Sequence, residues 1–378
     1  MMEFITDITG PIVPFLIILT ILVFVHELGH YVVARICGVR VEVFSIGFGP
    51  EIMGWTNKRS GTRWKFSLIP LGGYVKMFGD LNAASMPDSS MELAEEEKAY
   101  AFPHKTLAQR SWIVAAGPLA NFLFAIVLLA GLFAIVGQPF TPAVVDAVLP
   151  DSAAEAAGIQ SEDRIVAIDD EQIERFEELE RIISLSAGQQ LRIEVERAGE
   201  MIELVAVPRL TVKEDIFGNK HESGLLGVQS LRMEFTVLPL HVALWRATTQ
   251  TVSTTGDVLV GVWQIISQQR SFEELGGPIR IAQMSGQVAK IGIATSISFM
   301  ALLSINLGLI NLFPIPILDG GHLLYYGIEA LRGRPLGEKA QEYGFRIGLA
   351  LVMTLIIAVT WNDFVHLNFV DFVRDLVG

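Results

Sequence analysis

Four long apolar runs separate this chain of 378 residues into parts suited to a membrane and parts suited to water. A helix needs about 20 apolar residues to cross a hydrocarbon layer about 30 Å thick. The runs that approach or exceed this length are 11–36, 112–137, 296–317 and 347–361, and the last is the shortest. The pattern therefore predicts a polytopic α-helical membrane protein with about four transmembrane helices.

Basic residues near the ends of the runs predict their orientation, because lysine and arginine concentrate in cytoplasmic loops. Such residues flank the first connection and fill the loop between the third and fourth runs, whereas none precedes the first run. They are Arg35, Arg40, Lys105, Arg110, Arg332, Arg334, Lys339 and Arg346. In a bacterium this predicts a multi-pass inner-membrane protein with both termini and the segment 138–295 in the periplasm.

A stretch with the pattern of a soluble domain follows the second run. Between 141 and 209, strand-like runs alternate with helical pieces, and Leu191, Ile193 and Val195 alternate with polar residues before the turn-like sequence RAGE. About seventy residues suffice for one small mixed α/β domain. We divide the chain into an N-terminal membrane part (1–137), this domain (138–212), a periplasmic strand with interfacial amphipathic helices (213–295), and a C-terminal membrane part (296–378).

The amphipathic region 238–290 permits two interpretations. Its length allows a fifth transmembrane helix, but Arg246, Asp257 and Arg270 make such a crossing costly. Helices that lie in the membrane interface keep charged groups in water. We therefore favour interfacial helices over a fifth span.

Composition supports a mixture of membrane and water-exposed parts. Hydrophobic residues make up 51% of the chain and charged residues 18%, which is too apolar for a soluble protein and too charged for membrane throughout. The net charge of −13 argues against a nucleic-acid partner, because phosphates need basic residues to neutralise them. The single cysteine, Cys37, excludes an intrachain disulfide.

The first apolar run contains ionisable residues in the pattern H-E-x-x-H, from His26 to His30. On a helix these two histidines stand about 40° apart on one face, one turn from each other, so both imidazoles reach one metal ion. Glu27 borders the same face, where it can act as a general base. The alternative is a pair of interfacial histidines with a glutamate at a helix end, but hydrocarbon selects against such side chains. The pattern predicts one catalytic Zn²⁺ ion.

A catalytic zinc site takes three protein ligands and keeps a position open. Asp319, in the sequence NLFPIPILDGG, is the best candidate for the third ligand. With four spans, Asp319 lies near the cytoplasmic end of the membrane, as His26 and His30 do. A fifth span would place it on the opposite side, so the metal site and the interfacial helices support each other.

The residues before Asp319 suggest how a substrate is held. Pro314 and Pro316 exclude a regular helix and free backbone groups that can pair with an unwound substrate strand. Asn311 offers an amide to a substrate backbone or oxyanion. The alternative is a kinked helix in which the asparagine caps its own backbone.

Three further features have less specific interpretations. Asn121 lies within the second run, where we favour helix packing over catalysis because Gly117 and Ala120 permit close approach. The segment 65–79 alternates around a Pro and Gly-Gly turn, which predicts a cytoplasmic hairpin, either dipping into the membrane or on the surface. His322 is assigned a structural role, since three ligands are already assigned.

Together, HELGH, NLFPIPILDGG and the intervening domain resemble the site-2 protease family, and especially its bacterial branch of regulator of sigma-E proteases. GFGP, PLGGYVKM and GGPIRIAQ are similar to further landmarks of that family. The stretch VVDAVLPDSAAEAAGIQSEDRIVAIDD resembles a bacterial PDZ domain, although the enterobacterial relatives have two such domains and this chain shows one. The resemblance implies four transmembrane helices, a membrane-associated β-hairpin and one inserted periplasmic PDZ domain.

The resemblance also implies regulated intramembrane proteolysis by a zinc metalloprotease. It assigns zinc ligation to His26, His30 and Asp319, general acid/base catalysis to Glu27, and substrate handling to Asn311, Pro314 and Pro316. The family's substrates are single-span membrane proteins already cut outside the membrane, such as anti-sigma factors, and remnant signal peptides. The alternatives are a non-catalytic PDZ-containing membrane adaptor with a structural metal, and a transporter, which four spans without a repeated half disfavour.

Overall fold

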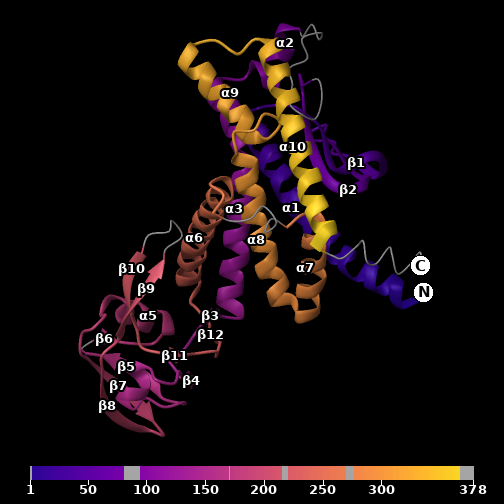
Figure 1. Ribbon diagram of the computed structural model, residues 1–378. Helices are drawn as coiled ribbons and strands as arrows, with labels where there is room; N and C mark the ends of the chain where they lie inside the picture. The colour runs from indigo at the N-terminus through magenta and orange to yellow at the C-terminus, as the bar shows by residue number, and fades with distance from the viewer. Residues whose placement is uncertain (1, 81–93, 170, 215–219, 270–275, 367–378) are drawn as a thin grey trace. The chain divides into compact units, whose positions relative to one another are not determined.

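The computed structural model describes residues 2–80, 94–169, 171–214, 220–269 and 276–366 (Figure 1). Two compact units divide the chain. One combines Met1–Leu132 with His241–Gly378, and the other is Phe133–Leu240. Arg270, which contributed to the interfacial interpretation, lies outside the described residues.

Four helices of the described residues are long and apolar enough to cross a membrane. They are α1 (Met2–Ile36), α3 (Leu107–Ile135), α8 (Ile293–Leu312) and α10 (Glu338–His366). These helices coincide with the four apolar runs. The third ends earlier than its run because Pro314 cannot continue it, and the fourth is longer than its run. The protein is therefore a multi-pass membrane protein.

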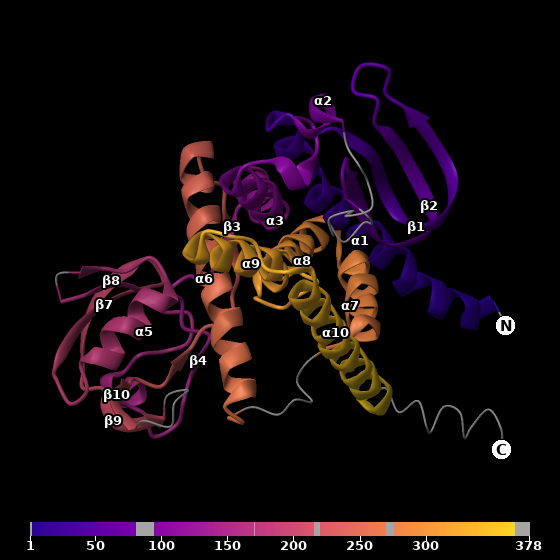
Figure 2. The same cartoon turned by 90° about the horizontal axis from the view of Figure 1, so that it is seen from above.

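The amphipathic region forms two further helices, α6 (Leu240–Ile266) and α7 (Pro278–Ile291). Neither is among the four candidate spans of the described residues. Helix α7 packs against α1 and α8, and α10 contacts its beginning (Figures 1 and 2). There the buried Asp363 carboxylate accepts backbone N–H bonds from Gly277, Ile279 and Arg280. The interfacial position of α6 and α7 stays a prediction.

Two long strands, β1 (Val41–Thr56) and β2 (Arg63–Met77), form a curved ribbon beside α1 (Figure 2). The predicted hairpin within 65–79 is wrong in its pairing. The two halves of β2 do not pair with each other, because the first half of β1 lies between them: Phe44 has both Val75 and Trp64 as partners. The ribbon turns at 57–62, and the Pro and Gly-Gly sequence only bends β2, with Gly72 at φ 125°.

Buried side chains at the base of this ribbon pack against the end of α1 and the start of α3. Phe44 is fully buried and stacks on Trp64, with ring centroids 4.3 Å apart. Val41, Val75 and Ile113 belong to the same cluster. The cluster therefore holds β2 beside the first two spans. Short helical elements, α2 (Glu95–Lys98) and a 3₁₀ turn (Phe102–His104), follow the ribbon, and α9 (Asp319–Arg332) connects α8 to α10.

The second unit is a mixed α/β domain. Its main sheet is antiparallel, in the order β6–β5–β7–β8, and it includes the helices α4 and α5. The bounds are β3 Gln138–Phe140, β4 Ala147–Val148, α4 Ala153–Ala157, β5 Arg164–Ile168, β6 Glu171–Gln172, α5 Phe176–Leu185, β7 Leu191–Arg197, β8 Glu200–Ala206, β9 Arg209–Glu214, β10 Lys220–Leu225, β11 Val228–Gln229 and β12 Glu234–Thr236.

The turn predicted from RAGE is confirmed, since Ala198 and Gly199 join β7 to β8 with φ angles of 52° and 85°. The inward-facing residues of β7 are buried together with Ile165 and Leu179. The unit extends beyond residue 212, because β10 pairs with β9 and β11 pairs with β4.

Candidate metal site

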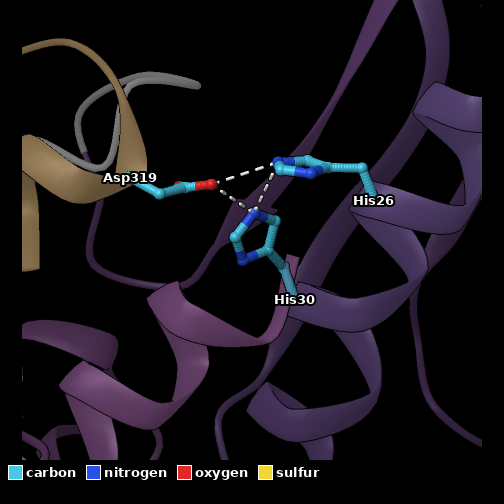
Figure 3. Close-up of side chains that lie close together, drawn as sticks. All are labelled: His26, His30 and Asp319. Atoms are coloured by element: carbon cyan, nitrogen blue, oxygen red, sulfur yellow. Dashed lines mark hydrogen bonds and ion pairs between the residues drawn. The ribbon is translucent and has the colours of Figure 1, made fainter. Parts of the chain in front are cut away.

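Three side chains from two distant parts of the chain meet inside the membrane unit. His26 and His30 extend from one face of α1, and Asp319 is the first residue of α9 (Figure 3). The Nε2 atoms of the two histidines lie 3.2 Å apart. Oδ2 of Asp319 lies 3.1 Å from Nε2 of His26 and 3.5 Å from Nε2 of His30. The structure thus brings together the three residues that the sequence suggested as metal ligands.

The geometry fits a zinc ion. Bonds of about 2.0–2.1 Å to a tetrahedral zinc separate its ligand atoms by about 3.3 Å, close to the three separations here. Asp319 Oδ2 is buried, and its close polar neighbours are the Nε2 atoms of the two histidines. A cation between the three atoms satisfies this oxygen and the facing lone pairs of both imidazoles at once.

Helix α3 makes room for the imidazoles and contacts both. A Cβ at Gly117 would lie 2.3 Å from Nε2 of His30, so only glycine fits there. His30 Nδ1 donates to the backbone carbonyl of Ile113 at 2.8 Å, which leaves Nε2 free for a metal. The Nδ1 atom of His26 lies 3.1 Å from Nδ2 of Asn121, a fully buried residue.

The position of Asp319 depends on the interruption between α8 and α9. Residues 313–318 are not helical, and Ile317 has φ 105°, a strained value for a β-branched residue. The start of α9 packs against this segment, since a Cβ at Gly320 would lie 2.3 Å from the carbonyl oxygen of Phe313. The prolines and glycines of PIPILDGG thus place the carboxylate opposite α1.

A cavity of about 180 Å³ opens at the three residues. Glu27 and Asn311, both predicted from the sequence as site residues, also line this cavity. Pro314 and Pro316 are not among the residues that line it. Pro316 instead packs against α10, since a Cβ at Gly348 would lie only 1.6 Å from its carbonyl oxygen. The other lining residues are Gly73, Tyr74, Val75, Met77, Val114, Ile317, Leu318 and His322.

Two residues of the site were not predicted from the sequence as functional residues. His322 lines the cavity, and burial lowers the pKa of its imidazole. Its position one helical turn after Asp319 was the available signal. The backbone amide of Val75 contacts the Glu27 carboxylate, and no pattern in the sequence predicts this contact.

A membrane-embedded zinc metalloprotease needs two histidines and a carboxylate that converge on one metal ion, and a glutamate outside this ligand set beside a cavity. This site has all of these features. The family model of peptidase family M50 matches residues 14–355. The chain is 47% identical to "Putative zinc metalloprotease Atu1380" of Agrobacterium fabrum, over 94% of this chain and 96% of that one. It is 35% identical to "Metalloprotease MmpA" of Caulobacter vibrioides, over 97% and 98% of the two chains. The protein belongs to peptidase family M50, the site-2 protease family, and is a zinc metalloprotease of the membrane.

Proposed function

We propose that His26, His30 and Asp319 hold the zinc ion, and that Glu27 is the general base for cleavage of single-span membrane proteins within the bilayer. The observation that carries this proposal is the approach of three ligand atoms to within 3.1–3.5 Å of each other, beside a cavity that Glu27 lines. A non-catalytic adaptor needs neither the cavity nor a carboxylate outside the ligand set.

Each group has a definite part in the reaction. Zinc, when bound, supplies a Lewis acid that polarises the scissile carbonyl and makes water a stronger acid. Glu27 takes the proton of the attacking water and passes it to the leaving amine nitrogen. Asn311, on the same cavity, donates its amide N–H to the substrate backbone.

The substrate must unwind before it is cut, since the peptide bonds of a helix are engaged in its own hydrogen bonds. The last part of β2 is best placed to receive the unwound strand, because Gly73, Tyr74 and Val75 line the cavity. Pro314 and Pro316 act indirectly, by ending α8 and freeing the segment that leads to Asp319.

The finer assignments rest on the family resemblance. The substrates are anti-sigma factors after a first extracytoplasmic cut, and remnant signal peptides. The second unit is a periplasmic PDZ domain that filters substrates by size or binds a new C-terminal carboxylate. A small cavity between α5 and the segment 224–228, from the end of β10 to the start of β11, supports a peptide-binding role. The protein lies in the inner bacterial membrane with the metal site near the cytoplasmic side, and the distribution of basic residues supports this orientation.

The decisive test uses purified full-length protein and a tagged single-span substrate, with and without a zinc chelator. Glu27→Gln should retain one zinc per chain yet lose at least about 100-fold in cleavage rate, because it removes only the base. Normal turnover by this variant, or cleavage that resists chelation, would reject the mechanism. Substrate binding by the wild type without any cleavage would establish the adaptor instead.

A further inference from the structure

The side chain of Asn121 bonds across to the neighbouring helix α1, where its partner is one of the proposed zinc ligands. It extends from α3 and is fully buried, and His26 is its hydrogen-bond partner among the described residues, at 3.1 Å from Nδ2 to Nδ1. The other end of the amide, Oδ1, is buried without a hydrogen-bond partner in the same part of the chain. A buried carbonyl oxygen without a donor is costly, so this arrangement needs an explanation.

The chemistry of a metal-binding histidine supplies that explanation. The Nε2 atom of His26 faces His30 and Asp319, so a bound metal takes the lone pair of Nε2. The ring proton then resides on Nδ1, which becomes a hydrogen-bond donor and cannot accept from an amide N–H. The two ends of an amide have nearly the same shape, and a half-turn of the group brings Oδ1 to within reach of Nδ1. The oxygen then has a donor, and the conflict between two donors disappears.

We propose that Asn121 is a positioning residue, which accepts the Nδ1 proton of His26 through its Oδ1 and thereby directs Nε2 of His26 to the zinc ion. The inference rests on the proposed metal site and adds a residue to it. His30 needs no such side chain, because the backbone carbonyl of Ile113 accepts its Nδ1 proton. Of the two histidines, only His26 therefore depends on a side chain that substitution can remove.

Helix packing is a separate function of the same position, and the structure assigns it to the backbone. Ser304 of α8 donates its hydroxyl to the backbone carbonyl of Asn121 at 2.8 Å. Ser304→Ala removes this link between α3 and α8 and leaves the Asn121 side chain in place. This variant is thus the matched control for a purely structural role.

The experiment measures zinc affinity of the full-length protein in detergent by competition with a chelator. Asn121→Ala should lower the affinity about 10–100-fold, the usual effect of losing such an outer partner. Asn121→Asp should restore it, because a carboxylate also accepts the Nδ1 proton. Ser304→Ala should bind zinc as the wild type does.

Cobalt(II) in place of zinc gives a second measurement that a packing role would not change. Asn121→Asp places a charged acceptor on His26, so the cobalt absorption bands should shift from those of the wild type, even if Asn121→Ala does not fold. The inference would be overturned by unchanged cobalt bands in Asn121→Asp or by unchanged zinc affinity in Asn121→Ala. It would also be overturned if Ser304→Ala lost as much zinc affinity as Asn121→Ala. A wild-type protein that binds no zinc would instead overturn the metal site itself.

Discussion

Two glycines allow the proposed zinc ligands to meet. At Gly117 a Cβ would lie 2.3 Å from Nε2 of His30 and 2.9 Å from Cε1 of His26, which is closer than side chains approach. At Gly320 a Cβ would lie 2.2 Å from the backbone oxygen of Leu312, so the helix that begins with Asp319 could not pack where it does. Neither glycine offers an atom to the metal, but the space at each position leaves no room for a larger residue.

Gly117→Ala should therefore displace the imidazoles and reduce zinc binding well below one ion per chain. Gly131→Ala is the matched control on the same helix, because nothing lies within 4 Å of its added Cβ. Alanine also favours a helix by about 1 kcal/mol over glycine, so both variants should retain their helices. Metal analysis after gel filtration measures the outcome, and a full complement of zinc in Gly117→Ala would contradict the account.

At the scale of elements, α9 carries the carboxylate and an ion pair fixes that helix to α3. Arg110 Nη2 lies 2.6 Å from Oε1 of Glu329, and both side chains are 16% exposed. The Arg110 guanidinium also lies over the Tyr326 ring, 4.9 Å from its centroid. Because Asp319 is the first residue of α9, any loosening of this contact moves the proposed ligand.

Glu329→Gln should loosen α9 by leaving Arg110 charged, largely buried and without its counter-ion. We expect faster hydrogen exchange in α9 and faster loss of zinc to a chelator, each by about 10-fold. Glu342→Gln breaks the exposed pair with Arg346 on α10 and should change neither rate, since exposed pairs contribute little. Equal behaviour of the two variants would show that the pair between α3 and α9 has no positioning role.

At the scale of the whole molecule, the membrane unit and the second unit depend on different chemistry. The described residues of the second unit include no proposed zinc ligand, and of the candidate spans they include only the last residues of α3. It is held by an apolar core and by Asp163, a fully buried carboxylate to which Arg197 donates from Nε and Nη2 at 2.7 Å each. Burial opposes ionisation of Asp163, but Arg197 and the backbone N–H of Gln160 outweigh it and hold the pKa of the carboxyl below its usual range.

This lowered pKa makes the second unit sensitive to acid. A carboxyl with a lowered pKa in the folded state stabilises the fold above about pH 4, and this contribution is lost as the pH falls through the folded value. Hydrogen exchange of β7 in the full chain, corrected for the intrinsic effect of pH, should therefore accelerate below about pH 4. Asp163→Asn should exchange faster at pH 7 and show a weaker dependence on pH. Glu171→Gln, which breaks an exposed pair with Arg181, should behave as the wild type does.

Local patterns predicted much of this protein. The four spans are apolar runs of sufficient length, and a membrane helix needs little beyond its own composition to be recognised. His26, Glu27 and His30 share one helix, so the helical period alone determines that they lie on neighbouring faces. The hairpin between β7 and β8 depends on adjacent residues, and the sequence predicted it for the same reason.

The sequence predicted the approach of Asp319 to the two histidines, whereas other contacts between distant segments could be found only in the tertiary structure. Two examples are the pairing of Phe44 with both halves of β2 and the contact of the Asn121 side chain with His26. The start of a new helix at Asp319 was likewise found only in the structure. Apolar length and helical period determine which segments are helices and which of their faces are polar. The contact partner of each face depends on packing among all of them, and no local pattern encodes it.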